Sequence, residues 1–312
     1  MFHKFKTAGI GLALFFAISM LNACKGDKKE QVGPPSDPDK LRIMVSVPPL
    51  ANLVSKIGGD HVHVDTLVDK GQDPHTFSPS PAQMKTLGRA NILFTVGMPF
   101  EGPLIDKITD TNAGITVADV AAGIEKLELE HHHHEEEGEA EGGHDHHDHD
   151  SDPHVWLAPY SIKIQLDNIA KSLTAAIPDQ AAQFAENLKT AQAELNQAHE
   201  KIKGKLKPFS GRQFFVFHPA FGYFANEYDL EQIAIEIGGN SPTPNELIGF
   251  LAVAKAAKIQ IIFIQPQFDP RSAEVIAKEL GAKVSILDPL APDVIANLHA
   301  ITDAIVEGFS GS

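Results

Sequence analysis

The sequence has 312 residues, of which 43% are hydrophobic, so it can bury the cores of about two domains at ~150 residues each. Its formal net charge is −15 at pH 7, and it lacks the basic stripe that phosphate backbones require, which excludes a nucleic-acid-binding protein. Cys24 is the only cysteine, which excludes an intramolecular disulfide.

Residues 1–23 have the pattern of a secretory signal peptide. A basic start precedes an uncharged, largely apolar run from Ala8 to Met20, which is shorter than the ~20 apolar residues that span a bilayer. Leu21-Asn22-Ala23-Cys24 resembles a bacterial lipobox, so we expect cleavage before Cys24 and its acylation, which would hold the protein on a membrane outside the cytoplasm, in the periplasm or at the cell surface. Residues 24–40 are predicted to be a flexible tether.

Strand-like and helix-like segments alternate from residue 41 onward. Short β-rich runs predict strands, and segments with helical spacing bounded by Pro or Gly predict helices. In a first lobe, 41–178, we expect strands at 42–47, 62–68 and 91–96 and helices at 50–57, 81–87 and 158–177. This alternation favours an α/β fold with mainly parallel sheets.

An acidic, histidine-rich segment at 125–152 interrupts the first lobe. From Glu125 to Asp150 it holds eleven Asp or Glu, one Lys and eight His, with almost nothing apolar, so it cannot bury enough surface to fold. We predict a disordered loop, which is either a solvated linker or a weak, multi-site zinc trap near the main site. Its histidines are His131, His132, His133, His134, His144, His146, His147 and His149.

A long amphipathic helix is predicted at 179–207, followed by a second lobe at 208–312. The helix repeats apolar residues at steps of three and four, which places them on one face: Phe184, Leu188, Ala191, Leu195, Ala198 and Ile202. At ~1.5 Å per residue this helix is roughly 40 Å long, enough to join two lobes. In the second lobe we expect strands at 213–217, 233–236, 260–264 and 283–287, and helices at 243–257, 271–280 and 292–307.

Three histidines lie where a strand or loop passes to the next element. His75 and His154 each follow an Asp-Pro pair, and His218 ends an apolar strand. Ligands of open α/β sheets bind at this edge, so the three are candidate metal ligands. Asp288, at the end of the 283–287 strand, is either a fourth ligand or a turn residue.

Three neutral imidazoles with a carboxylate or a water suit tetrahedral Zn²⁺. Calcium and magnesium prefer oxygen ligands, whereas ligand type alone leaves manganese, cobalt and nickel open. Because zinc binds deprotonated imidazoles, we expect its affinity to weaken below about pH 6. Four other histidines of the two lobes and the long helix are interpreted as surface or packing residues, namely His61, His63, His199 and His299.

Four spaced motifs resemble those of the zinc-binding solute-binding proteins of bacterial ABC importers. They are Asp73-Pro-His-Thr-Phe-Ser-Pro-Ser80, Asp152-Pro-His-Val-Trp-Leu-Ala-Pro159, Phe217-His-Pro-Ala-Phe-Gly-Tyr-Phe224 and Ile264-Gln-Pro-Gln-Phe-Asp269. The resemblance covers nearly the whole mature chain and includes the His/acidic loop before the second histidine.

This resemblance implies two α/β lobes with mainly parallel sheets, joined by one long rigid helix, with the metal between them. It assigns His75, His154 and His218 as ligands and matches Asp288 to a fourth position that varies among zinc members. Manganese-preferring relatives usually carry Glu at the third position, so His218 points to zinc. The implied function is capture of zinc, as transported ligand rather than catalytic cofactor, and its delivery to an importer permease with its ATPase. We expect a monomer.

Two other function classes stay open. Three histidines with an open position also build zinc hydrolases, although no His-Glu-x-x-His or Gly-x-Ser-x-Gly pattern occurs, so we expect no enzyme. A lipid anchor with a metal-binding loop would also suit a surface adhesin or a metal-storage lipoprotein.

Overall fold

The structure is a computed structural model that describes residues 40–128, 151–236 and 243–310. The predicted signal peptide, Cys24, the tether up to residue 39 and the histidine-rich loop from 129 to 150 lie outside the described residues. Within the part of the chain that is described, no helix combines the length and apolarity that crossing a membrane requires.

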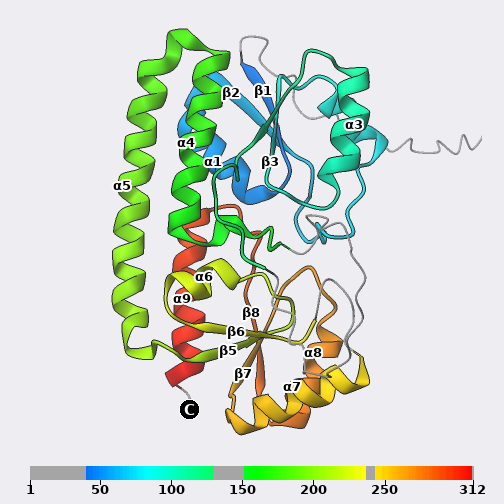
Figure 1. The fold of residues 1–312 in the computed structure, drawn as a ribbon, viewed down its shortest axis with the longest axis vertical. Helices are drawn as coiled ribbons and strands as arrows, with labels where there is room; N and C mark the ends of the chain where they lie inside the picture. Colours follow the sequence, from blue (N-terminus) through cyan, green and yellow to red (C-terminus); the bar gives the residue numbers. More distant parts are fainter. Residues whose placement is uncertain (1–39, 129–150, 237–242, 311–312) are drawn as a thin grey trace, which may run out of the picture. The chain divides into compact units, whose positions relative to one another are not determined.

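Two sheets of parallel strands organise the fold (Figure 1). The first sheet has the order β2-β1-β3-β4 and contains β1 (Leu41–Val45), β2 (Val62–Thr66), β3 (Ile92–Thr95) and β4 (Thr116–Asp119). The second has the order β6-β5-β7-β8 and contains β5 (Gln213–Val216), β6 (Glu231–Ala234), β7 (Ile261–Ile264) and β8 (Lys283–Ile286). The predicted fold, two α/β lobes with parallel sheets joined by a long helix, is confirmed.

Helices connect these strands and join the lobes. Those of the first lobe are α1 (Pro48–Gly58), α2 (Pro81–Leu87), α3 (Glu101–Thr111) and α4 (Pro159–Ala176), with a short 3₁₀ turn, η3 (Val155–Leu157), before α4. The connecting helix is α5 (Ala181–Leu206). The second lobe contains α6 (Gly222–Glu227), α7 (Pro244–Ala256), α8 (Pro270–Leu280) and α9 (Val294–Ser310).

Helix α2 shows how local sequence sets an element boundary. The Ser80 side chain accepts from the Gln83 amide and the Gln83 side chain accepts from the Ser80 amide, which is a capping box. Pro81 occupies the first turn, where its missing N–H costs nothing. Gln83 Nε2 also donates to the Leu67 carbonyl at 2.6 Å, which ties the start of α2 to the chain beyond β2. The loop between β2 and α2, which carries His75, is therefore anchored at its far end.

Helix α5 packs against helices of both lobes. It contacts α1 and α4 of the first lobe and α9 of the second. All the residues of its predicted apolar face are buried except Leu188, which is half-buried against the same core. Two exposed ion pairs flank it, Lys56–Glu194 at 2.7 Å and Lys205–Asp303 at 2.5 Å.

One hydrophobic core runs through both lobes. It includes Ile43 and Phe94 of the first sheet, Leu195 of α5, and Phe214 and Leu298 of the second lobe, all at most 2% exposed. Each such side chain contributes about 1.5–3 kcal/mol on burial. Because the core is continuous across α5, the two lobes are not independent bodies joined only by a tether.

The structure adds elements that the sequence pattern did not predict. Helix α3, strand β4 and the short helix α6 were not expected. The histidine-rich segment is also ordered at both ends, because Glu128 pairs with Ser151 in an antiparallel bridge and the Asp152 amide donates to the Leu127 carbonyl at 2.7 Å. The predicted disorder of the whole range 125–152 is therefore wrong at 125–128 and at 151–152.

The Glu101 carboxylate closes the turn between β3 and α3. It accepts from the Val96 amide at 3.0 Å and from the Gly97 amide at 2.7 Å, although its side chain is buried. Gly97 has φ +99°, a left-handed conformation that favours glycine. Burial raises the pKa of Glu101, and the backbone donors offset part of this effect.

Replacing Glu101 with alanine is expected to lower the free energy of unfolding by about 2–4 kcal/mol, because two backbone N–H groups lose their buried acceptor. Urea unfolding followed by circular dichroism measures this. Glu279→Ala is the matched control, since its exposed ion pair with Lys255 should contribute less than ~1 kcal/mol. Equal midpoints for the two variants would contradict the structural role of Glu101.

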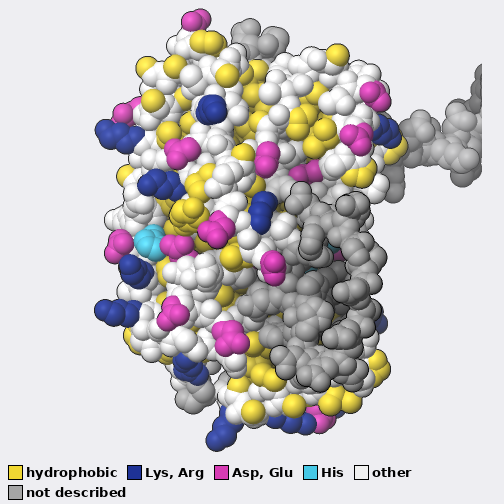
Figure 2. Space-filling view, viewed as in Figure 1, with side chains coloured by type: hydrophobic (Ala, Val, Ile, Leu, Met, Phe, Trp, Pro, Cys, Tyr) yellow, Lys and Arg dark blue, Asp and Glu magenta, His cyan; other side chains and the backbone are white. Residues whose placement is uncertain are grey.

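Charged side chains of both signs are mixed on the face seen in Figure 2. Lys and Arg side chains there are separated by Asp and Glu rather than gathered into one patch. The described residues visible on this face therefore form no basic stripe of the kind that a phosphate backbone requires.

Candidate metal centre

His75 lies in the loop between β2 and α2. Asp73 Oδ1 accepts from the His75 amide at 2.9 Å, and Asp73 Oδ2 accepts from the Thr76 hydroxyl at 2.9 Å. Pro74 between them is buried and fixes φ of the turn. The Asp-Pro-His sequence thus forms a local turn that fixes the position of the His75 backbone, from which the ring extends.

His154 precedes η3, and in its Asp-Pro-His turn the aspartate contacts the histidine ring as well as the backbone amide. Asp152 Oδ1 accepts from the His154 amide at 2.9 Å and from its ring Nδ1 at 2.7 Å. Both side chains are buried. The Trp156 ring packs edge-on against His154 at 5.4 Å and donates Nε1–H to the Pro289 carbonyl of the second lobe at 2.7 Å. The His154 ring is therefore fixed at the contact between the lobes.

His218 follows β5 and is held from three sides. Its amide donates to Gln265 Oε1 at 3.0 Å, and its ring Nδ1 lies 2.9 Å from Glu236 Oε2. The Phe268 ring stacks on the imidazole at 5.0 Å with an interplanar angle of 27°. The second lobe thus presents one oriented imidazole at the carboxyl edge of its sheet.

The three imidazoles converge although they are far apart in the sequence. The Nε2 atoms of His75 and His154 are 3.2 Å apart, and those of His218 and His154 are 3.3 Å apart. One nitrogen from each of the three lies within 4.8 Å of the others, and this is the only such His, Cys, Asp or Glu group among residues 40–128, 151–236 and 243–310. The structure brings the three predicted histidines together.

The contacts of the ring nitrogens fix which atoms face the centre. Burial raises the pKa of Asp152 to about 7. In its ionised form a carboxyl group only accepts, so His154 and His218 then donate their Nδ1–H groups to Asp152 and Glu236. Their neutral Nε2 atoms then carry lone pairs that face each other across 3.3 Å and cannot hydrogen-bond to one another. Zinc–nitrogen bonds of ~2.0–2.1 Å at tetrahedral angles separate two ligand nitrogens by about 3.3–3.4 Å. The observed spacings match that separation.

Burial lowers the pKa of two of the three imidazoles. Desolvation, followed by the neighbouring imidazoles of His154 and His218, lowers the pKa of His75 to about 3. Desolvation also lowers the pKa of His154 well below its usual value, with His218 as the second cause. The His75 ring therefore resists protonation until the pH is much lower than 6, and the expected weakening of zinc affinity below about pH 6 stays a prediction.

The cavity between the rings is small. Its volume is about 10 Å³, close to the ~10–15 Å³ that one water requires, and its lining includes the three histidines, Gln267 and Leu290. It has room for one ion and at most a small ligand on it.

Asp288 lies outside the group of three histidines. Its Oδ1 accepts from Gln267 Nε2 and from the Leu290 amide, both at 3.0 Å. The contact with the Leu290 amide is the hydrogen bond expected of a turn residue, the alternative to a ligand role in the sequence analysis. Direct ligation by Asp288 stays a prediction.

The other described histidines have different neighbours. His61 packs edge-on against Phe184, His63 lies 3.5 Å from Asp65, and His199 lies 3.3 Å from the Tyr228 hydroxyl. These contacts agree with their interpretation as surface or packing residues.

Sequence reasoning did not assign roles to the residues that orient the rings. For Asp152 the signal was its position two residues before His154, where an Asx-type turn forms. For Glu236 the signal was strand register: Val216 pairs with Ala234, so His218 and Glu236 each follow their strand by two residues. Parallel pairing therefore places both at the same edge.

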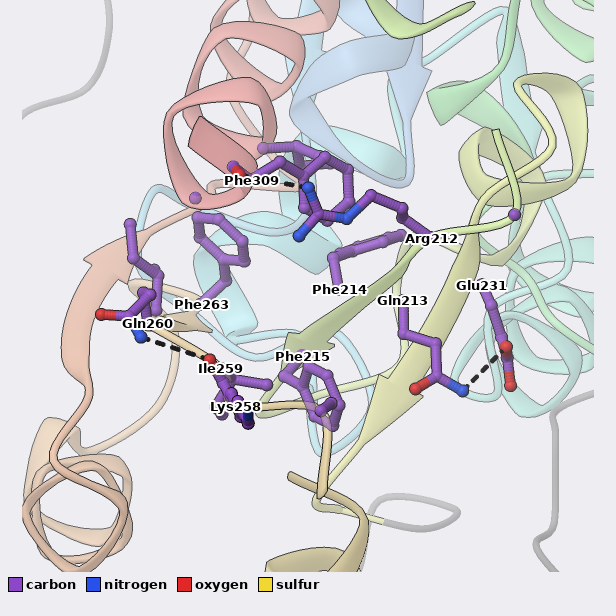
Figure 3. Close-up of a pocket in the computed structure, with 15 residues that line it drawn as sticks. Arg212, Gln213, Phe214, Phe215, Glu231, Lys258, Ile259, Gln260, Phe263 and Phe309 are labelled. Atoms are coloured by element: carbon purple, nitrogen blue, oxygen red, sulfur yellow. Dashed lines mark hydrogen bonds between the residues drawn. The ribbon is translucent and has the colours of Figure 1, made fainter. Parts of the chain in front are cut away.

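A second cavity lies at the opposite edge of the second sheet (Figure 3). Its volume is about 260 Å³, and it is lined by residues at the amino ends of β5 and β7, including Gln213, Phe215 and Ile261. None of the three histidines lines it. Its polar side chains include a pair in which Gln213 Nε2 donates to Glu231 Oε2 at 2.9 Å.

Comparison with known proteins adds independent findings. Residues 43–308 match the family model described as "Zinc-uptake complex component A periplasmic". The high-affinity zinc uptake system protein ZnuA of Haemophilus ducreyi is 32% identical over 287 residues, covering 86% of this chain and 92% of that protein. Its namesake from Bacillus subtilis is 28% identical over 286 residues, covering 90% and 88%.

A crystal structure of ZnuA has the same fold. It is 38% identical in sequence and superposes with a TM-score of 0.78, covering 86% of this chain and 99% of that one. With the family model matched over most of its length, the chain belongs to the ZnuA family of zinc-binding solute-binding proteins of metal importers.

Proposed function

We propose that the protein captures Zn²⁺ between its lobes through Nε2 of His75, His154 and His218 and delivers it to the permease of an ABC importer. The observation that carries this proposal is the convergence of three Nε2 atoms, since that of His154 lies 3.2 Å from that of His75 and 3.3 Å from that of His218. These are the separations expected between nitrogen ligands of one tetrahedral zinc ion. Zinc is the transported ligand, and its fourth position is filled by Asp288 or by a water.

The ligand set favours zinc over other divalent ions. Three neutral imidazoles exclude the all-oxygen shells that calcium and magnesium prefer. Manganese is the alternative metal, and carboxylates suit it better than a third imidazole does. The buried carboxylates of Asp152 and Glu236 reach imidazole Nδ1 atoms, so they raise ligand basicity instead of adding oxygen ligands.

The cavity volume argues against a zinc hydrolase. About 10 Å³ between the rings is far smaller than the usual volume of a substrate pocket. We therefore propose a carrier rather than an enzyme. Hydrolysis of generic esters by the zinc-loaded protein, lost in His218→Ala, would contradict this.

The place of action is proposed from the sequence. Cleavage before Cys24 and acylation of Cys24 would hold a monomer on a membrane outside the cytoplasm, within reach of a permease and its ATPase. The lobes are assigned to 41–178 and 208–312, with the connecting helix at 179–207. The histidine-rich loop is proposed to concentrate zinc weakly near this site.

Two measurements test the proposed function. Competition titration of the purified protein should give one tight zinc site, together with weaker sites from the loop, and weaker binding of manganese. Disrupting the gene should prevent growth of its host under zinc chelation, and added zinc should restore growth. Rescue by manganese rather than zinc would refute the metal assignment, and growth unaffected by the disruption would refute a role in uptake.

Zinc binding is expected to change the arrangement of the lobes little. Helix α5 packs against α1, α4 and α9, and the core is continuous through both lobes, so a wide hinge opening would break buried contacts. The radius of gyration from small-angle X-ray scattering should change by less than about 1 Å between zinc-free and zinc-loaded protein. A compaction of several ångströms would contradict a stiff connection.

A further inference from the structure

Gln267 lies between Asp288 and the three imidazoles. Its Nε2 donates to Asp288 Oδ1 at 3.0 Å, and its side chain lines the cavity of about 10 Å³ with the histidines. Its Oε1 is buried and has no hydrogen-bond partner among the residues that the structure describes. A buried acceptor left without a donor is unfavourable, so this atom requires a partner that the cavity can supply.

Asp288 fixes which end of the Gln267 amide is available. A carboxylate can only accept, so the NH₂ group faces Asp288 and the oxygen is the end left over. Asp288 is itself held, since Oδ1 also accepts from the Leu290 amide at 3.0 Å and its carbonyl accepts from Asn297 Nδ2 at 2.8 Å. The amide of Gln267 is therefore oriented by an anchored neighbour.

The loop that carries Gln267 also holds His218. Gln265 accepts from the His218 amide, and Phe268 stacks on the His218 ring. Pro266 between Gln265 and Gln267 stiffens this short segment. The position of Gln267 relative to one proposed ligand is thus set by direct contacts on both sides.

These contacts bear on the fourth position of the zinc ion. Three imidazoles leave one tetrahedral position open, and the cavity volume is close to that of one water. Water bound to zinc is polarised by the metal and is a strong hydrogen-bond donor, which is what an amide oxygen requires. Asp288 Oδ1 already accepts two hydrogen bonds, and Asp288 does not belong to the close group of three histidines.

We propose, on the basis of the proposed zinc site, that Gln267 Oε1 accepts a hydrogen bond from a water on the fourth position of the ion. Asp288 then acts through Gln267, by orienting its amide, and does not bind the ion directly. Gln267 and Asp288 are positioning residues in this arrangement. With a water on the fourth position, release of the ion breaks three protein–metal bonds rather than four, which suits a protein that must release its cargo.

The test measures zinc dissociation constants and Co²⁺ absorption spectra of the full chain and three variants. Gln267→Leu and Asp288→Ala should each raise the zinc dissociation constant by about 10-fold, the lower end for lost outer-shell partners. The double variant should be no weaker than the weaker single variant, because both act on one water. The Co²⁺ spectrum should stay tetrahedral throughout, since the water remains.

Direct ligation by Asp288 predicts a different pattern. Asp288→Ala would then weaken binding much more than Gln267→Leu, would do so equally in the Gln267→Leu background, and would alter the Co²⁺ spectrum. Any of these results overturns the proposal. So does an unchanged zinc affinity in Gln267→Leu.

The matched control is Gln213→Leu. This residue also donates its amide to a carboxylate, that of Glu231, but at the opposite edge of the same sheet (Figure 3), so zinc affinity should not change. His75→Ala distinguishes failure of the water assignment from failure of the proposed zinc site. If it abolishes tight binding while Gln267→Leu does not weaken it, only the water assignment fails; if it leaves binding intact, the proposed site fails.

Discussion

Replacing His75 with alanine should lower zinc affinity by about 100-fold or more. Structural zinc sites bind with roughly 10–16 kcal/mol through four ligands, or about 3 kcal/mol per ligand. A loss of that size is about 100-fold, since 1.4 kcal/mol corresponds to tenfold. Competition against a chromophoric chelator measures the change. The expected reason is loss of one of the three Nε2 atoms at the centre.

His75 is the clearest of the three positions to test. Its ring is only half-buried, and the loop turn is formed through its backbone amide, so truncation should leave the fold intact. Removing His154 would instead strand the buried Asp152 carboxylate without its ring partner. His63→Ala is the control, because that partly exposed histidine of β2 lies beside Asp65 and does not belong to the group of three. Equal zinc affinity of His75→Ala and the parent protein would remove the basis of the carrier assignment.

The sequence was sufficient for the parts of the fold that local chemistry determines. Helix α2 spans Pro81 to Leu87 as predicted, and the apolar stripe of α5 is the face that packs. The position of His75, His154 and His218 where one element passes to the next made them candidate ligands, and the family resemblance implied that they meet between the lobes. Apolar periodicity and turn-forming residues were therefore enough to predict most of the helices and strands.

The remaining features depend on contacts that no local pattern encodes. Glu101 satisfies amides of a turn whose shape is set by β3 and α3, and α3 itself was not expected. Gln267 matters because two loops of the second lobe place its amide beside Asp288. A Leu-Asp-Pro-Leu segment is compatible with a ligand or a turn, and only the tertiary structure shows that Asp288 Oδ1 accepts from Leu290.

The Glu236 carboxylate should matter to zinc binding although it does not touch the ion. It accepts from Nδ1 of His218 at 2.9 Å, which fixes the tautomer whose Nε2 lone pair faces the centre and raises the basicity of that nitrogen. Glu236→Leu removes this acceptor and should lower zinc affinity by roughly 10–100-fold. Glu236→Gln should lie between the parent protein and Glu236→Leu, because its oxygen can still accept but its negative charge is lost.

Asp73, in the first of the two Asp-Pro-His turns, supplies the control for the Glu236 prediction. Asp73 bonds to the backbone and hydroxyl of its own turn, whereas Glu236, like Asp152, reaches an imidazole Nδ1. Asp73→Asn keeps an acceptor for the His75 amide, so zinc affinity should change far less than in Glu236→Leu. Unfolding of the zinc-free variants separates loss of folding from loss of binding, because Glu236→Leu also leaves the buried Nδ1–H group of His218 without its acceptor. If folded Glu236→Leu holds zinc as tightly as the parent protein, the orientation of His218 comes from the Gln265 hydrogen bond and the Phe268 stacking alone.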